Sequence, residues 1–81
     1  MNVSVHFYAQ LRDLTGVSES VIEMPAGTTV AQLLETIYQR TPSLRLHDKA
    51  ILTGAGVEFV DRSYVIEPDD KISIMPPVQG G

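Results

Sequence analysis

The sequence contains no cysteine. A disulfide, a thiolate nucleophile and a sulfur-ligated metal site are therefore excluded. The only two histidines, His6 and His47, lie far apart in the chain and have no acidic residues at ligand spacing. Because zinc needs three or four converging ligands, we expect no metal site.

Positive charge is also scarce. Six Lys and Arg residues, scattered along the chain, stand against ten Asp and Glu, which gives a formal net charge of −4. Proteins that bind nucleic acids neutralise phosphates with clustered basic side chains. We therefore expect no nucleic-acid partner, and a basic partner protein fits the charge better.

Long apolar runs are missing as well. No stretch approaches the roughly 20 apolar residues needed to span a bilayer, and the first residues do not have the pattern of a signal peptide. We therefore expect a cytoplasmic protein without membrane contact. The 81 residues, 43% of them hydrophobic and 20% charged, are typical of a single globular domain.

Hydrophobic periodicity predicts the first elements. Residues 2–8 alternate between apolar and polar side chains, as in a strand with one buried face, and a second strand is expected over residues 19–24. Between them lie one or two helical turns that end near Gly16. The short connection predicts an antiparallel hairpin.

A helix is expected to follow Thr29. Thr29 and Gln32 have the spacing of a capping box, and the apolar residues after Thr29 form one helical stripe: Val30, Leu33, Leu34, Ile37 and Tyr38. The helix should end before Pro42, which disfavours helical geometry in the residue that precedes it. We expect Leu44 and Leu46 to pack back onto the core.

The remaining segments complete an α+β pattern. Apolar strand pieces are predicted, with turns at 54–56 and 68–70, over residues 50–53, 57–60, 64–66 and 71–75. One helix crossing one sheet gives two layers, and a ubiquitin-like β-grasp, a mixed sheet of about five strands packed on one main helix, has this order and length. We expect residues 1–75 to form this domain and residues 76–81 to form a flexible tail.

The tail itself is the candidate reactive segment. It reads Pro76-Pro77-Val78-Gln79-Gly80-Gly81. The prolines favour an extended path, and the glycines leave no Cβ beside the carboxylate, so this end could enter a narrow channel in another protein. A free carboxylate reacts only after activation: adenylation by an ATP-using partner and then a sulfur donor would give a thiocarboxylate. Alternatively, the glycines are incidental to function.

Three segments resemble MoaD, the small-subunit family of molybdopterin synthase, within the MoaD/ThiS ubiquitin-like group. They are the stretches 7–16 (Phe-Tyr-Ala-Gln-Leu-Arg-Asp-Leu-Thr-Gly), 24–30 (Met-Pro-Ala-Gly-Thr-Thr-Val) and 70–81, which includes the Pro-Pro-Val-x-Gly-Gly tail. The sequence departs from the family at Gly56, where Asn is common, and at His6, where an apolar residue is usual.

The resemblance implies a sulfur carrier. Gly81 would be adenylated by a MoeB-like enzyme that uses ATP, and a sulfurtransferase would then supply the sulfur of a thiocarboxylate. The tail, Pro76 to Gly81, would enter a MoaE-like large subunit, in a heterotetramer, and pass sulfur to cyclic pyranopterin monophosphate. The chain itself would bind no cofactor, and the catalytic side chains would lie mainly on the large subunit.

Four residues are predicted to contact the partner. Tyr8, Phe59 and Met75 point outward by alternation and are candidates for an apolar docking patch, and Arg12 could pair with acidic groups or with the tail. The alternative is that all four are ordinary surface residues that contact no partner. Other functions also stay open: a ThiS-like or tRNA-thiolation sulfur carrier, a ubiquitin-like protein modifier, or a plain interaction domain.

Overall fold

The computed structural model describes residues 1–77 of the chain, and Val78, Gln79, Gly80 and Gly81 lie outside the described residues. The elements are β1 (Asn2–Phe7), α1 (Gln10–Thr15), β2 (Glu19–Glu23), α2 (Val30–Arg40), the 3₁₀ helix η1 (Pro42–Ala50), β3 (Leu52–Ala55), β4 (Glu58–Phe59) and β5 (Lys71–Met75). The predicted order of strands and main helix is confirmed.

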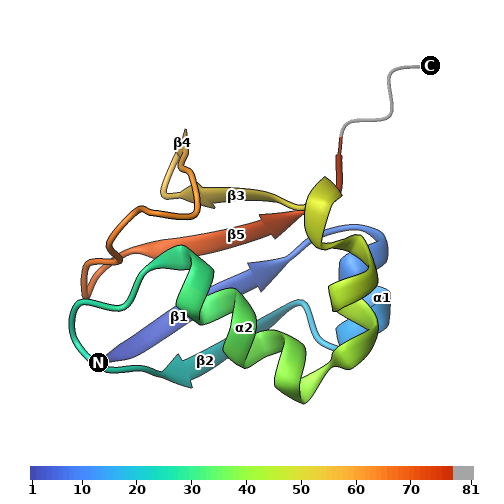
Figure 1. Cartoon of the computed structure of the whole chain (residues 1–81), viewed down its shortest axis with the longest axis horizontal. Helices are drawn as coiled ribbons and strands as arrows, with labels where there is room; N and C mark the ends of the chain where they lie inside the picture. Colours follow the sequence, from blue (N-terminus) through green and yellow to red (C-terminus); the bar gives the residue numbers. More distant parts are fainter. Residues whose placement is uncertain (78–81) are drawn as a thin grey trace.

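The strands form one mixed sheet in the order β2-β1-β5-β3-β4. β1 pairs antiparallel with β2, as the short connection predicts, and parallel with β5. β3 pairs antiparallel with β5 and with β4. Helix α2 crosses one face of this sheet (Figure 1), which gives the two layers of a β-grasp.

The core lies between α2 and the sheet. Thr29 Oγ1 accepts a hydrogen bond from the Gln32 N–H at 3.3 Å, and Gln32 Oε1 accepts one from the Thr29 N–H at 2.9 Å, so the predicted capping box is present. The five stripe residues of α2 are all buried. They pack in one cluster with the inward side chains of the sheet, which are Val3, Val5, Phe7, Ile22, Ile72 and Ile74.

Two glycines adopt the left-handed conformation that residues with a Cβ disfavour. Gly16 ends α1 at φ 79°, as the sequence predicts. Gly56, at φ 61°, turns the chain from β3 into β4. A glycine at position 56 therefore meets the backbone requirement of a turn in which Asn is the other common choice.

The segment after α2 differs from the expectation. Residues 42–50 form a 3₁₀ helix, and although Leu44 is fully buried, Leu46 is 87% exposed. The prediction that Leu46 packs onto the core is wrong, because residues two apart on a helix with three residues per turn point in different directions.

The later strands also have other bounds than predicted. β3 includes Gly54 and Ala55, β4 has two residues, and the expected strand 64–66 is a single bridge between Thr29 and Val65. The ends of β3 are set by its backbone pairing with β5. The pattern of apolar residues does not reveal this pairing.

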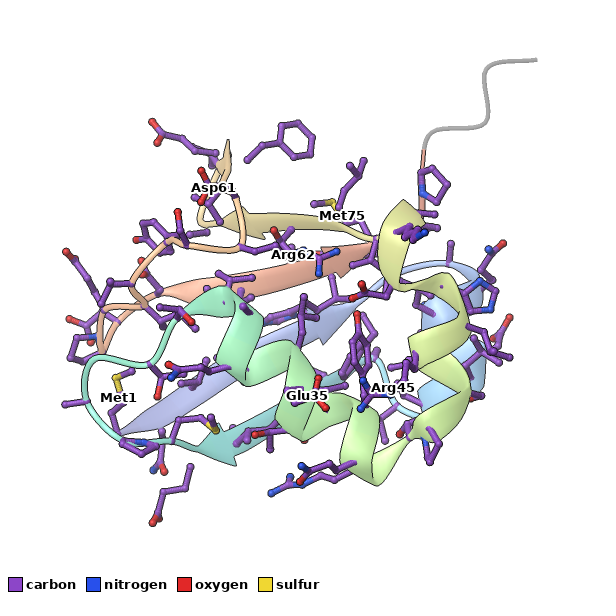
Figure 2. The ribbon with its side chains drawn as sticks, in the orientation of Figure 1. Met1, Glu35, Arg45, Asp61, Arg62 and Met75 are labelled. Carbon is purple, nitrogen blue, oxygen red and sulfur yellow. The ribbon has the colours of Figure 1, made fainter. Side chains whose placement is uncertain are left out.

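A network of polar side chains connects η1 to α2 and to Arg62, which follows β4. The Tyr38 hydroxyl donates to Asp48 Oδ1 at 2.5 Å, and Arg62 donates to the same oxygen at 2.9 Å. These two hydrogen bonds hold the pKa of the Asp48 carboxyl below its usual value. Glu35 on α2 and Arg45 on η1 also point toward each other (Figure 2) and form a surface ion pair at 2.6 Å.

Candidate functional site

Within residues 1–77, no helix covers the sheet face opposite α2 (Figure 1). Strand alternation directs every second side chain to this open face. Pairing brings some of them into rows across the strands: Gly54 lies opposite both Phe59 and Ser73, and Leu52 lies opposite Met75. The open face therefore collects side chains from β3, β4 and β5.

Three predicted docking residues are placed on this side. Phe59 is 73% exposed and Tyr8 is 47% exposed, whereas Met75 is half-buried. The Met75 side chain lies over Gly54, so that a Cβ built on Gly54 would be 3.4 Å from Met75 Cε. Tyr8 follows β1, and its N–H donates to the Ile74 carbonyl at 3.2 Å, which places it next to Met75.

Gly54 and Leu52 are members of this face that the sequence-based list of contacts omits. The residues themselves carry little signal for this placement, because the polar Thr53 faces the core at 5% exposure while the apolar Leu52 faces outward. Gly54 is buried although it faces outward, because the Met75 side chain and the Glu58 backbone cover it.

Arg12 lies on α1, directly after a strained turn. Ala9 has φ 52° and ψ −131°, a backbone conformation that glycine adopts more readily than alanine does. The turn takes the chain from Tyr8 on the sheet into α1. The ion pairs formed within residues 1–77 do not include Arg12, and its partner role stays a prediction.

The tail begins where β5 ends. Pro76 is half-buried and Pro77 is exposed, and no contact of the remaining predicted insertion residues, which lie outside the described residues, is known. A chain extends by at most about 3.6 Å per residue. A segment of six residues therefore spans at most about 22 Å, and a protein that bound the far end of the segment after Met75 would have to approach the end of β5.

The turn before β5 is fixed by Asp70. Its carboxylate accepts hydrogen bonds from the Glu67 N–H at 2.8 Å and from the Tyr64 hydroxyl at 2.7 Å, and the second of these raises the pKa of Tyr64 to about 12. Asp70 therefore serves the turn, as predicted. Within residues 1–77, no three His, Asp or Glu side chains are grouped as metal ligands would be, and no helix has the length and apolar character to cross a membrane.

Fold and site together define a class: a ubiquitin-like β-grasp protein with an open sheet face beside the residues that follow its last strand. A solved structure from Pyrococcus furiosus, described as subunit 1 of molybdopterin converting factor, matches with a TM-score of 0.87 and 27% identity over 96% of this chain and 99% of that one. Another, the complex of subunits 1 and 2 of molybdopterin-converting factor from Helicobacter pylori, matches with a TM-score of 0.70 over the full length of both chains. At 22% identity the second match shows the fold alone.

Sequence comparison identifies the family. The model of the ThiS family matches residues 5–81. The human molybdopterin synthase sulfur carrier subunit is 32% identical, over 98% of this chain and 93% of its own length. The chain belongs to the ThiS family, and the resemblance inferred from its sequence is confirmed.

Proposed function

We propose that this chain is the sulfur carrier subunit of a molybdopterin synthase and that its Gly81 carboxyl carries the sulfur. The observation that supports this most directly is the Gly80-Gly81 terminus, six residues beyond the last strand, in a chain without cysteine. A side-chain thiol is not available, and the terminal carboxyl is the group that can be converted into a sulfur nucleophile.

The chemistry proceeds in three steps. A MoeB-like enzyme joins the Gly81 carboxylate to AMP from ATP and releases pyrophosphate. A sulfurtransferase then provides a sulfide equivalent that displaces AMP and leaves a thiocarboxylate. In a MoaE-like large subunit the thiocarboxylate sulfur bonds to a side-chain carbon of cyclic pyranopterin monophosphate as an oxygen substituent leaves that carbon. Water then cleaves the acyl–sulfur bond, which restores the carboxylate and leaves the sulfur on the pterin. Two such cycles provide the two sulfurs of the dithiolene.

This chain supplies positioning and the reactive terminus. It binds no cofactor, and ATP is used by the activating partner in the cytoplasm. Pro76 and Pro77 restrict the backbone at the start of the tail, and Val78, Gln79 and Gly80 enter the partner with Gly81. Tyr8, Phe59 and Met75 contact the large subunit, and Arg12 on α1 contributes a charged contact.

The test is a single-turnover reconstitution. The chain is prepared with a C-terminal thiocarboxylate and mixed with the large subunit encoded by the same genome and with cyclic pyranopterin monophosphate, and molybdopterin is measured. We expect product with the thiocarboxylate and none with the carboxylate form or with a chain that ends at Gln79. No product, from a large subunit that is active with another small subunit, would direct the assignment to thiazole synthesis, tRNA thiolation or protein modification.

A further inference from the structure

The last strand of the sheet ends at Met75, and two adjacent prolines follow it. β5 lies between β1 and β3 (Figure 1), so it is paired along both edges. A strand in this position ends completely only where the hydrogen bonds to both neighbours stop. The feature that ends β5 must therefore act on two sides.

Successive residues of β5 direct their backbone groups to opposite neighbours. The N–H of Tyr8, which follows β1, donates to the Ile74 carbonyl at 3.2 Å, so residue 74 faces β1. The Gly56 N–H donates to the Lys71 carbonyl at 3.0 Å, so residue 71 faces β3. When this alternation is continued past Met75, position 76 faces β1 and position 77 faces β3.

Position 76 is where the β1 side would receive its next hydrogen bond. In the parallel register of β1 and β5, an N–H at this position would point to the Tyr8 carbonyl. Pro76 has no N–H to donate. The Tyr8 carbonyl accepts a hydrogen bond from the Leu11 N–H at 3.1 Å, so it has a partner without any contribution from position 76.

Position 77 has the same relation to the β3 side. Leu52 pairs with Met75 in antiparallel register, which places Ala50 opposite position 77. Ala50 is the last residue of η1, and both it and Pro77 are exposed. Pro77 again has no N–H. The two prolines therefore remove one donor on each side of β5, whereas a single proline would leave the other side able to pair.

The two neighbouring strands end in a different way. The chain turns out of β1 at Ala9, with φ 52°, and out of β3 at Gly56, with φ 61°. A proline cannot adopt such a turn, because its ring fixes φ near −65°. Positions 76 and 77 hold the only adjacent prolines in the sequence. At the end of β5, the missing donors thus replace the turn that ends the other strands.

We propose that Pro76 and Pro77 form a two-sided stop that keeps the C-terminal tail from pairing with β1 and β3. The proposal rests on the proposed function, in which the Gly81 carboxyl must enter the active sites of other proteins. Pairing of positions 76 and 77 would shorten the free tail from six residues to four and its reach from about 22 Å to about 14 Å. Both prolines are positioning residues, since neither takes part in bond formation.

The test separates the missing N–H from the proline ring. Pro76→Ala and Pro77→Ala, alone and together, restore the donors. A chain with N-methylalanine at both positions, made by ligation of a synthetic tail, has neither the ring nor the N–H. Pro68→Ala, in the turn before β5, is the control for loss of a proline elsewhere.

Two properties of each full-length chain are measured. Amide hydrogen exchange, followed by NMR, reports whether the restored N–H groups are hydrogen-bonded in the isolated chain. Pyrophosphate release by the activating enzyme of the same genome, with ATP, gives KM and kcat for the chain as substrate. Thermal unfolding checks that every variant is folded.

In the double alanine variant, we expect the restored N–H groups to exchange about two- to tenfold more slowly than in a free peptide of the same tail, the range that one net hydrogen bond provides. KM should rise by a similar factor while kcat stays unchanged, because only the unpaired fraction can bind and a bound tail has already left the sheet. Each single variant should have a smaller effect. The N-methylalanine chain and Pro68→Ala should stay within about twofold of the original chain, because their unpaired fraction is the same.

The other outcomes overturn the stop in different ways. Equal increases in KM for the alanine and N-methylalanine chains would show that the prolines act by stiffening the tail. Unprotected N–H groups would show that the tail does not pair even when the donors are present, and protection without a change in KM would show that pairing does not withhold the carboxyl. In each of these cases, adenylation of the original chain leaves the proposed function intact. An enzyme that is active on another carrier but does not adenylate the original chain would overturn the proposed function, and hydrogen exchange would still decide whether the stop exists.

Discussion

The two faces of the sheet use alternate residues of the same strands for different purposes. Ile74 faces α2 and is fully buried, whereas its neighbours Ser73 and Met75 face the open side and are half-buried. On the helix side the polar groups are paired, as in the network of Tyr38 and Asp48. On the open side apolar groups such as Phe59 remain exposed. Stability and recognition are thus separated by the strand period of two, and each face can be altered by itself.

The largest expected effect tests this separation with one residue type in two places. Leu33→Ala removes a fully buried side chain from α2 and should lower the free energy of unfolding by about 2–5 kcal/mol. Leu46→Ala, at a position that is 87% exposed, should change it by less than about 0.5 kcal/mol. Urea unfolding of both variants gives the comparison, and equal losses would contradict it.

The second effect concerns the polar network on the helix side. Tyr38→Phe removes the hydroxyl that donates to Asp48 and should lower the free energy of unfolding by about 1–2 kcal/mol. Burial, and then the hydrogen bond to Asp48, raise the pKa of Tyr38 above its usual 10. The folded state therefore favours the neutral hydroxyl, and this contribution is complete below pH 10 and lost as pH rises above it.

Unfolding measured from pH 8 to 12 checks the sign. The difference in stability between the original chain and Tyr38→Phe should be constant up to about pH 10 and shrink above it. Tyr64 titrates in both proteins and cancels in this difference. A gap that grows with pH would mean that the Tyr38 hydroxyl does not stabilise the fold in its neutral form.

A smaller effect of opposite sign is expected at the strained turn between Tyr8 and α1. Ala9→Gly should raise the free energy of unfolding by about 1 kcal/mol, because relief of the strain at φ 52° exceeds the added entropy of the unfolded chain. Ala55→Gly, in β3, serves as the control and should be destabilising. Thermal unfolding distinguishes the two directions.

The smallest effect on stability is expected on the open face, together with a large effect on binding. Phe59→Asp should leave the unfolding midpoint nearly unchanged, because the ring is 73% exposed. It should weaken binding to the large subunit by about tenfold or more, since it places a charge in an apolar contact. Leu46→Asp, an exposed apolar position on η1, is the matched control, and calorimetry that finds both variants equal would refute the docking role of Phe59.

Much of the fold could be predicted because local rules agree with it. The capping box of Thr29 and Gln32, the left-handed Gly16 and the alternation of Val3, Val5 and Phe7 each depend on residues close in sequence. The predicted strand bounds were wrong where pairing between strands far apart in the sequence determines them. Gly54 belongs to β3 because it pairs with Ser73 of β5, and a glycine between two apolar pieces resembles a turn when that strand is not considered.

The candidate site was also predictable only where local sequence properties determine it. The sequence by itself determined the proposal of a reactive terminus, the absence of a thiol and the outward direction of Tyr8 and Phe59, since composition and a period of two are local properties. Only the tertiary structure decided that Phe59 and Met75 face each other across Gly54 and that Leu46 lies in solvent. The first feature depends on strand register, which is set by pairing between residues far apart in the chain. The second depends on residues 42–50 forming a 3₁₀ helix, in which residues two apart point in different directions.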